Sequence, residues 1–551
     1  MNQHVYRLFL VLCLLFPLTE KLQAQQHRGA GKFWIFFTDK KGVSEFVPVR
    51  PEARTRRALR GRTASPDLDR PLSPEYLRTL RQHGIEPVVQ SRWLNAVTAY
   101  LTPEQRALVQ TLPFVRRVRP VARFVQKPLP FSTLPSMKAH DDVYGPSAFQ
   151  LAFINAIKPL ENGYRGKGIR IGFLDTAFWL SHPALIHLSE TGRLIGTYDF
   201  VYDREDVSEG HPHGTMTSST TLGYDEGSLI GPAHQGALLA AHTEYAPAEI
   251  NQEEDWFVAG MEWMEQMGAD IVNVSLGYSV FDEGQRSYTY EDMDGDTAIP
   301  TIAADKAAQL GIVVVVSAGN EGGCGSPAYC WYYITSPADG DSVITVGAVR
   351  PDSTLAPFSS RGPTADGRIK PDVVALGVGV YVAYPPDQYI YASGTSFSAP
   401  LTTGVVAQML QANPSLSPVE VRDILRATAS QASSPDNMMG WGIINADAAV
   451  REAIARLKLP ENASPRLQRI YPNPASQNVT IAIAAPRSTP SITVELYNAL
   501  GQRVRSWTWT DLYPGINQRT FSVAALASGV YFIRLMGTEQ PVWGKMVVQH
   551  F

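Results

Sequence analysis

The sequence predicts a doubly wound α/β domain with a mostly parallel sheet, preceded by a small α+β unit and followed by a β-sandwich. Two continuous apolar runs, residues 168–174 and 311–316, are typical of strands that are covered on both faces. Between them, residues 256–267 repeat apolar side chains at helical spacing. Strands that alternate with helices indicate the doubly wound arrangement, which we place at residues 145–457.

The first residues of the chain, 1–24, have the pattern of an export signal. Arg7 precedes an apolar run at 8–16 that is too short to span a bilayer, and small-residue cleavage chemistry follows near Ala24. A lipoprotein signal ending at Cys13 is the less favoured alternative, because a large residue precedes that cysteine. No later stretch of about 18 apolar residues follows, so we expect a mature protein that does not span a membrane.

The unit at residues 25–135 reads as a small α+β fold. It is expected to contain a strand at 33–37, a helix after Ser73, a strand at 96–101 and a helix that begins at Thr102-Pro103. A Pro- and Ser-containing stretch at its end, residues 127–135, is typical of a linker.

This front part of the chain is basic, whereas the remainder is acidic. Residues 26–149 hold 21 Lys and Arg against 10 Asp and Glu, while residues 150–551 hold 25 against 41. The asymmetry suggests two electrostatically matched partners, and the acidic remainder argues against nucleic acid as a ligand. A second interpretation, compatible with the first, is that a run of arginines forms a solvated, cleavable basic loop. These are Arg50, Arg54, Arg56, Arg57, Arg60 and Arg62.

The last part of the chain, residues 466–551, changes character. Apolar and polar residues alternate at 478–483, 492–497 and 530–535, with turn residues between these runs. Short alternating strands at this spacing predict a small antiparallel sandwich.

Two cysteines, Cys324 and Cys330, remain once the export signal is removed. An exported protein folds in oxidising surroundings, so this pair fits one disulfide that closes a small loop. Two free buried thiols are the alternative.

Three segments of the middle domain each place a reactive residue at the end of a strand or the start of a helix. Asp175 ends a buried strand, His213 opens a segment rich in small residues, and Ser396 lies at the start of a helix. A serine hydroxyl needs an imidazole to take its proton and a carboxylate to orient that imidazole. The chain order Asp, His, Ser is one of the known orders of such triads.

Asn320 follows the strand at 311–316 and therefore reaches the same carboxyl edge of the sheet, where doubly wound folds bind ligands. Its amide and the Ser396 backbone N–H can together hold a tetrahedral oxyanion. Singly, Asp175 and His213 can also be explained as structural residues, and Ser396 as a helix cap.

These segments resemble those of the subtilisin-like serine proteases over roughly residues 145–450. The most specific piece is Gly-Thr-Ser-x-Ser-Ala-Pro at 394–400. The resemblance implies that Asp175 orients, His213 acts as base and then acid, Ser396 attacks and Asn320 polarises. Ala177 stands where the family usually has Gly after Asp-Thr, a change expected to shift the local backbone only.

The same resemblance implies that Ser275, Leu276 and Gly277, together with Gly319, bind the substrate. Extended substrate backbone would pair with this segment, which favours unfolded or flexible protein substrates. The family usually has Gly after the triplet, whereas Tyr278 here is expected to narrow the cleft.

An acidic loop carries the candidate metal ligands Asp292, Asp294 and Asp296, which alternate around a Gly. It is similar to the opening of a calcium loop, but the position of the final glutamate of an EF-hand is Ala303. A plain acidic surface turn is the alternative. The triad chemistry requires no cofactor, and structural calcium remains a prediction.

The flanking units have resemblances of their own. Residues 93–97 and 112–115 are similar to an inhibitory propeptide, which implies that the chain's own prosegment is a partner. From Tyr471 onward the chain resembles the C-terminal sorting domain of the type IX secretion system. That resemblance implies export through the periplasm of a didermic bacterium, with sorting machinery as partner and the cell surface or medium as destination. A generic binding sandwich is the alternative.

Two functions remain open at this point. One is a secreted serine endopeptidase that acts on protein or peptide substrates after its propeptide is removed. The other is a catalytically silent surface binding protein with the same fold.

Overall fold

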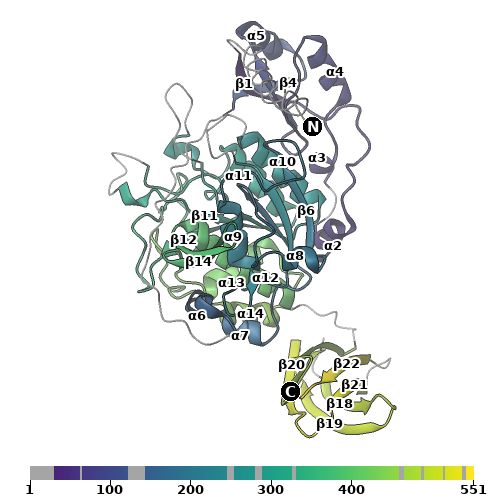
Figure 1. The fold of residues 1–551 in the computed structure, drawn as a ribbon. Coiled ribbons are helices and arrows are strands. Elements are labelled where there is room, and N and C mark those ends of the chain that lie inside the picture. Colours follow the sequence, from purple (N-terminus) through teal and green to yellow (C-terminus); the bar gives the residue numbers. More distant parts are fainter. Residues whose placement is uncertain are drawn as a thin grey trace, which may run out of the picture.

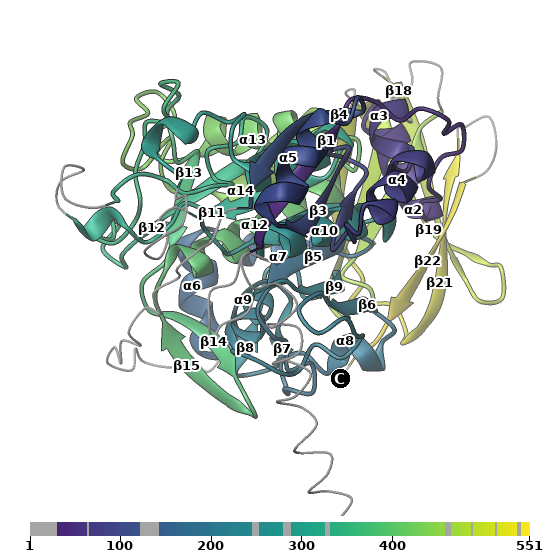
Figure 2. The same ribbon diagram turned by 90° about the horizontal axis from the view of Figure 1, so that it is seen from above.

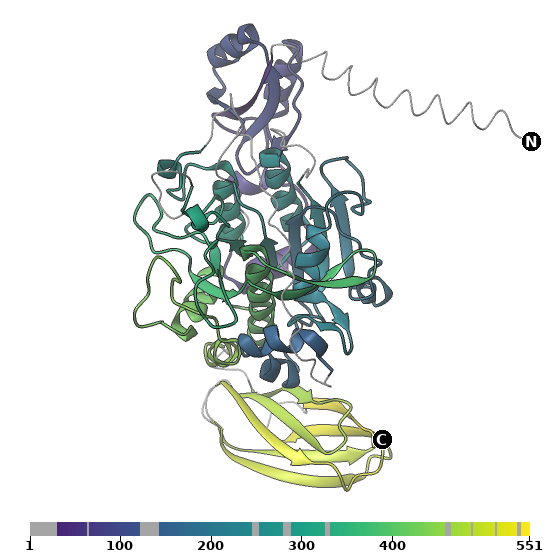
Figure 3. The same ribbon diagram turned by 60° about the vertical axis from the view of Figure 1, so that its left-hand side comes forward.

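The computed structural model describes residues 30–62, 65–121, 143–244, 253–278, 288–324, 331–457, 464–485, 489–512, 515–536 and 542–550. They form three units. Figure 1 shows the α+β unit at one end of the middle domain and the C-terminal sandwich at the other, and Figure 3 shows the same order from another side. Within these ranges, no helix has both the length and the apolar character needed to cross a membrane.

The middle domain is built on a seven-stranded parallel sheet with the order β13-β12-β11-β10-β5-β9-β6. Its strands are β5 (Arg170–Asp175), β6 (Leu194–Asp199), β9 (Ala237–His242), β10 (Ile271–Val274), β11 (Val313–Ser317), β12 (Ile344–Val349) and β13 (Val373–Leu376). The chain order reverses between β5 and β10, which makes this the switch point where such sheets bind ligands. The doubly wound prediction is confirmed.

Both faces of this sheet are covered, which explains the apolar runs without alternation. In β11, Val313 and Val315 join one core, and Val314 and Val316 join the other. The first core is closed by α9 (His213–Leu222), α12 (Thr395–Ala412), α13 (Pro418–Thr428) and α14 (Ala446–Ala455), and the second by α10 (Glu253–Gln266) and α11 (Ile299–Gln309).

Shorter elements complete the middle domain. The helices are α6 (Ala148–Phe153), α7 (Ile157–Glu161) and α8 (His187–Glu190), with single turns η1 (Gly145–Ser147), η2 (Tyr290–Asp292) and η3 (Gly322–Cys324). Two small hairpins pair β7 (Tyr224–Asp225) with β8 (Leu229–Ile230) and β14 (Val380–Tyr384) with β15 (Gln388–Ala392).

The N-terminal unit has a four-stranded antiparallel sheet of order β2-β3-β1-β4. Its elements are β1 (Gly31–Phe37), α2 (Pro51–Leu59), α3 (Pro66–Asp69), α4 (Pro74–Gln82), β2 (Gln90–Ser91), β3 (Ala96–Leu101), α5 (Pro103–Thr111) and β4 (Val115–Pro120). Alternate residues of β1 face opposite ways. Ile35 and Phe37 join the unit's own core, whereas Trp34 and Phe36 join the middle domain's core beside α10. Strand β1 is therefore buried on both faces.

The C-terminal unit is a sandwich of a three-stranded sheet, β16-β17-β20, and a four-stranded sheet, β19-β18-β21-β22. The strands are β16 (Arg466–Tyr471), β17 (Asn478–Ala485), β18 (Thr489–Asn498), β19 (Arg503–Leu512), β20 (Gly515–Ser522), β21 (Gly529–Met536) and β22 (Val542–Val548). All named pairs are antiparallel, as predicted. Ala482 and Ala484 pack against Ile454 and Leu457 at the end of the middle domain.

A buried histidine before β9 makes the stability of the middle domain depend on pH. His234 donates from Nδ1 to the Gly231 carbonyl over 3.1 Å and stacks on Tyr224. Burial lowers its pKa from 6.5 to about 4. As pH falls from 6.5 toward 4, His234 takes up a proton in the unfolded chain but stays neutral in the folded chain. The contribution of neutral His234 to the unfolding free energy is therefore present above pH 6.5 and is lost as pH falls toward 4.

The unfolding free energy of the chain falls between pH 6.5 and pH 4. We expect this fall to be smaller, by on the order of 3 kcal/mol, in His234→Asn, which keeps a hydrogen-bond donor but does not titrate. Urea denaturation of the full-length chain, with and without the substitution, measures this. His83→Asn, at an exposed position, is the matched control and should leave the pH profile unchanged. Equal profiles for all three chains would contradict the assignment.

Candidate active site

Asp175 and His213 meet at the carboxyl edge of the sheet. Asp175 ends β5 with no exposed surface, and its Oδ1 lies 2.7 Å from Nδ1 of His213, the first residue of α9. The same Oδ1 accepts the Thr176 backbone N–H at 2.7 Å, and Oδ2 accepts the Thr217 hydroxyl at 2.9 Å. Both carboxylate oxygens are thus held, and the imidazole can keep its Nδ1 proton toward Asp175 with Nε2 free.

Ser396 is the second residue of α12, and the residue after it is in ring contact with His213. Gly394 precedes the helix with φ of +154°, a backbone conformation that favours glycine. The Ser396 hydroxyl donates to the Ser275 carbonyl at 3.2 Å, and the ring of the next residue, Phe397, lies 5.8 Å from the His213 ring. Catalytic hydrogen bonds often form only when substrate binds, so this resting contact is compatible with a nucleophile.

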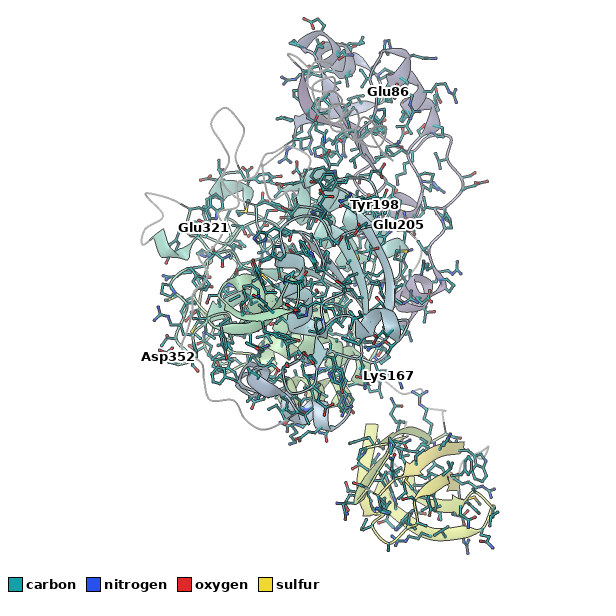
Figure 4. All side chains as sticks on the ribbon, viewed as in Figure 1. Glu86, Lys167, Tyr198, Glu205, Glu321 and Asp352 are labelled. Carbon is teal, nitrogen blue, oxygen red and sulfur yellow. The ribbon has the colours of Figure 1, made fainter. Side chains whose placement is uncertain are left out.

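Asn320, which follows β11, is held by the residue before the serine. Its Oδ1 accepts the Thr395 backbone N–H at 2.9 Å and the Thr395 hydroxyl at 3.0 Å. Because both bonds go to the oxygen, the amide NH₂ group remains available as a donor next to Ser396. Figure 4 labels Glu321, the next residue, on the opposite side of the domain from Tyr198 of β6.

Two supporting residues were not identified from the sequence. Thr217 lies four residues after His213 on α9, so helical spacing alone places it on the same face, and this signal was available. Thr395, by contrast, contacts Asn320 from 75 residues away along the chain. Only the tertiary structure brings these two together.

The candidate substrate segment follows β10 directly. Ser275 and Leu276 are buried, and the Ser275 hydroxyl donates to the Ser396 carbonyl at 2.9 Å. The expectation that Tyr278 narrows the cleft is wrong. Its ring is 1% exposed and packs edge-on against Phe257, with the hydroxyl donating to Glu244, because the core under α10 offers both apolar contacts and an acceptor.

The unusual Ala177 after Asp-Thr packs against another glycine. A Cβ added to Gly210 would lie 3.2 Å from the Ala177 Cβ, so the extra methyl of Ala177 occupies room that Gly210 leaves. The Asp175–His213 contact forms with this alanine in place.

The candidate metal ligands do not form a metal site. Asp292 Oδ2 accepts the Thr289 N–H, while both oxygens of Asp294 accept bonds from Asp296 and Thr297. Across the described ranges, the structure contains no group of three or more His, Cys, Asp or Glu side chains placed to hold a metal ion. Asp292 caps η2 and Asp294 caps the turn that leads into α11, so these two carboxylates do not fit a calcium site.

Three predictions fall on residues outside the described ranges and stay untested. Residues 1–24 lie outside the described residues, and so does Cys330, the expected disulfide partner of Cys324. The linker at 127–135 lies outside them as well.

Acidic residues of α10 bind basic residues of the N-terminal unit. Lys32 pairs with Asp255, and Arg92 pairs with Glu262 at 3.3 Å and with Glu265 at 3.3 Å, with every partner buried. Burial raises the pKa of Asp255 and of Glu262. Figure 2 shows the unit's strands and α5 above α10. The predicted charge match between the basic N-terminal unit and the acidic middle domain therefore takes the form of ion pairs at this interface.

The basic helix α2 extends this interface to the amino edge of the sheet. Arg56 binds Glu265 at 2.9 Å, and Arg60, just after the helix, donates to the carbonyl oxygens of Asp270 and Gly311, which precede β10 and β11. Burial lowers the pKa of Arg60 to about 10. Because Arg56, Arg57 and Arg60 are buried, the reading of a solvated loop is wrong for these three.

We expect Arg56→Ala to lower the unfolding free energy of the full-length Ser396→Ala chain by about 2 to 5 kcal/mol, because it leaves the buried Glu265 short of a partner. Urea denaturation measures the loss. Arg54→Ala is the matched control: it lies on the same helix but is exposed, and its hydrogen bond goes to Val49 within the same unit. Equal losses from both substitutions would show that the interface charges do not matter.

Three family models match the chain. They are the subtilase family at residues 166–442, a Bacteroidota propeptide domain of S8 peptidases at residues 32–133, and a secretion-system C-terminal sorting domain at residues 469–549. Subtilisin DY of Bacillus licheniformis is 33% identical over 304 residues, which cover 55% of this chain and 98% of the relative. Serine protease AprX of Bacillus subtilis (strain 168) is 30% identical over 314 residues, covering 52% of this chain and 66% of the relative. Subtilisin of Bacillus pumilus is 31% identical over 291 residues, covering 52% and 93%.

Proposed function

Because the chain belongs to the subtilase family, we propose that it is a secreted serine endopeptidase that cleaves protein substrates through an acyl-enzyme on Ser396. The observation that carries the proposal is the 2.7 Å contact of Asp175 with His213 at the sheet edge where α12 begins, with Ser396 as the second residue of that helix. A carboxylate, an imidazole and a hydroxyl at one edge form the set that serine hydrolysis needs.

In the proposed reaction, His213 Nε2 takes the proton of Ser396 as its oxygen attacks the substrate carbonyl carbon. Asp175 stabilises the imidazolium and holds its orientation. The peptide C–N bond then breaks as His213 gives the proton to the leaving amine. Water, deprotonated by His213, attacks the acyl-enzyme. The ester C–O bond then breaks, and His213 returns the proton to the Ser396 oxygen. We expect activity at neutral to alkaline pH, because His213 must be neutral to act as a base.

The oxyanion of the tetrahedral intermediate is proposed to bind the Asn320 NH₂ group and the Ser396 backbone N–H. Thr395 supports the amide, since its two hydrogen bonds hold the Asn320 oxygen. The Ser396 N–H belongs to the first turn of α12, where backbone donors and the helix dipole favour negative charge. In the relative subtilisin, loss of the equivalent kind of donor costs about 10²–10³ in kcat.

The flanking units are proposed to control folding, activation and delivery. We assign residues 1–24 to a signal peptide, 25–135 to an inhibitory propeptide, 145–457 to the peptidase domain and 466–551 to the sorting domain. The chain is a secreted or cell-surface protein with a sorting domain. Passage through the periplasm and handover to the type IX machinery are part of the proposal, whereas calcium at the acidic loop of residues 292–297 is not.

Labelling with a serine-directed fluorophosphonate tests the proposal. We expect the processed wild-type protein to carry one label and Ser396→Ala to carry none. A processed wild-type protein that takes up no label would contradict the proposal and favour the silent binding protein.

A further inference from the structure

The C-terminal sandwich has two outer faces, and residues of the middle domain pack against one of them. Ala482 and Ala484 of β17 point away from the sandwich core and contact Ile454 and Leu457. Both are alanines, so no large side chain separates the two units there. The outer face of the other sheet, β19-β18-β21-β22, instead carries large side chains that are open to solvent.

Three aromatic side chains lie on this second outer face. The inner face is fixed by the buried residues Val494, Leu496, Ile533, Leu535, Met546 and Val548. Because side chains alternate along a strand, Tyr497, Phe532 and Trp543 point the other way, and we call them the aromatic face. Tyr497 lies opposite Phe532, and the Trp543 ring lies 5.6 Å from the Tyr497 ring. Phe532 is 38% exposed and Trp543 is 52% exposed, although the outer face of such a sheet normally carries polar side chains.

Two basic side chains stand among these rings. Arg534 lies opposite Trp543, and its guanidinium group is 5.3 Å from the centre of the indole ring. Lys545 lies opposite Phe532 and is exposed. Among the residues that the structure describes, neither side chain donates a hydrogen bond, and the buried Nε of Arg534 has no partner. Both cations are therefore open to a ligand that carries negative charge.

The accessible charge around the aromatic face is positive. The one carboxylate among its described side chains, Glu495, is 6% exposed. It is already bound by Arg503 over 2.8 Å and by the Tyr497 hydroxyl over 2.8 Å. The whole chain has a formal net charge of −4, so the excess of positive charge is a local property of this face.

This combination of groups favours an acidic sugar polymer as the ligand. One side of a pyranose ring presents C–H groups and packs flat on an aromatic ring. A carboxylate on the sugar accepts two parallel hydrogen bonds from a guanidinium group. Neighbouring strands lie about 4.8 Å apart, close to the length of one sugar unit, so rings on three successive strands match a repeating chain.

We propose that the aromatic face binds an acidic polysaccharide. Tyr497, Phe532 and Trp543 stack on its pyranose rings, while Arg534 and Lys545 pair with its carboxylates. The inference adds a ligand to the C-terminal unit beyond its role in sorting, and it does not depend on the proposed peptidase activity. It gives a secreted or cell-surface protein a means of attachment to acidic polysaccharide.

Affinity electrophoresis of the full-length chain tests this, with polygalacturonate in the gel. The dissociation constant is taken from the retardation at several polymer concentrations. Neutral galactan has sugar rings without carboxylates, and polyglutamate has carboxylates without sugar rings. We expect polygalacturonate to bind about 10-fold more tightly than either, and its affinity to fall as salt is raised.

Trp543→Ala and Arg534→Gln should each weaken the binding of polygalacturonate by about 10-fold, because aromatic and arginine side chains carry most of the energy of such contacts. Leu500→Ala and Arg505→Ala are the matched controls and should bind like the wild type. Leu500 is 83% exposed in the turn between β18 and β19, and Arg505 donates to the Ser522 carbonyl of the other sheet.

No retardation of the wild type by polygalacturonate would overturn the inference. Galactan bound as tightly as polygalacturonate would also overturn it, and polyglutamate bound as tightly would do so in favour of an acidic protein partner. An unchanged affinity in Trp543→Ala or in Arg534→Gln contradicts the assigned site, with circular dichroism as the check of folding. Should Trp543→Ala fail to fold, Phe532→Ala takes its place and decides.

Discussion

Ser396→Ala is expected to lower kcat by roughly 10⁶-fold, as in the relative subtilisin, and to leave the prosegment attached. The serine supplies the only oxygen that the proposed acyl-enzyme can form on, and alanine offers no hydroxyl to the His213 base. The mass of the secreted species measures the second effect: wild type should lose about the first 125 to 145 residues and the variant should not.

Ser398→Ala is the matched control, since it removes a hydroxyl from the same helix that donates to the Thr395 carbonyl. It should retain processing. If wild type and Ser396→Ala both lose the prosegment, another protease matures the chain and kcat must be compared on a peptide. If neither chain is cut, the assignment of the prosegment or of the activity is wrong.

Asp175→Asn should lower kcat by roughly 10⁴-fold while leaving the fold intact. Asparagine has the shape of aspartate, but its amide lacks the charge that stabilises the imidazolium. Both oxygens of Asp175 accept hydrogen bonds, from Thr176, Thr217 and His213. Asparagine has only one acceptor oxygen, because its other terminal group is an NH₂ donor. The imidazole would then settle in the wrong tautomer. Peptide hydrolysis at a fixed pH measures the loss, with circular dichroism to check the fold.

Thr217→Val separates orientation from charge, because it removes one hydrogen bond to Oδ2 and keeps the carboxylate. We expect it to cost roughly 10- to 100-fold in kcat, because a hydrogen bond to a charged group contributes about 1.5–3 kcal/mol. Activity of Asp175→Asn within tenfold of wild type would mean that the Asp175–His213 contact is structural only.

Some of the fold could be predicted because its signals are local. The apolar run at 311–316 has too little alternation for a half-exposed strand, and it became β11 at Val313–Ser317, buried on both faces. Thr102 followed by Pro103 predicted a helix start, and α5 begins there with both bonds of a capping box. Such signals involve residues that are neighbours in the chain, so they can be interpreted without knowing how the rest of the molecule folds.

The acidic loop shows where local reading fails. Asp292 and Asp294 have the spacing of metal ligands, yet Asp292 accepts a hydrogen bond from Thr289 before η2, and Asp294 accepts bonds from the turn that leads into α11. Spacing reports which residues are close in sequence, whereas ligation depends on where the oxygens point. The same limit applies to Tyr278, whose ring turned into the core rather than toward the substrate.

By itself the sequence predicted the three units, the parallel sheet and the charge match between the N-terminal unit and the middle domain, and it supplied Asp175, His213 and Ser396 as the proposed reactive residues. Only the tertiary structure decided that Arg56 pairs with Glu265, 209 residues away, and that the rings of Tyr497 and Trp543 meet on one sheet face. The physical reason is that periodicity, caps and motifs are properties of short stretches. Contacts between segments that are distant in the chain depend on how the whole chain packs, so the sequence of a short stretch does not predict them.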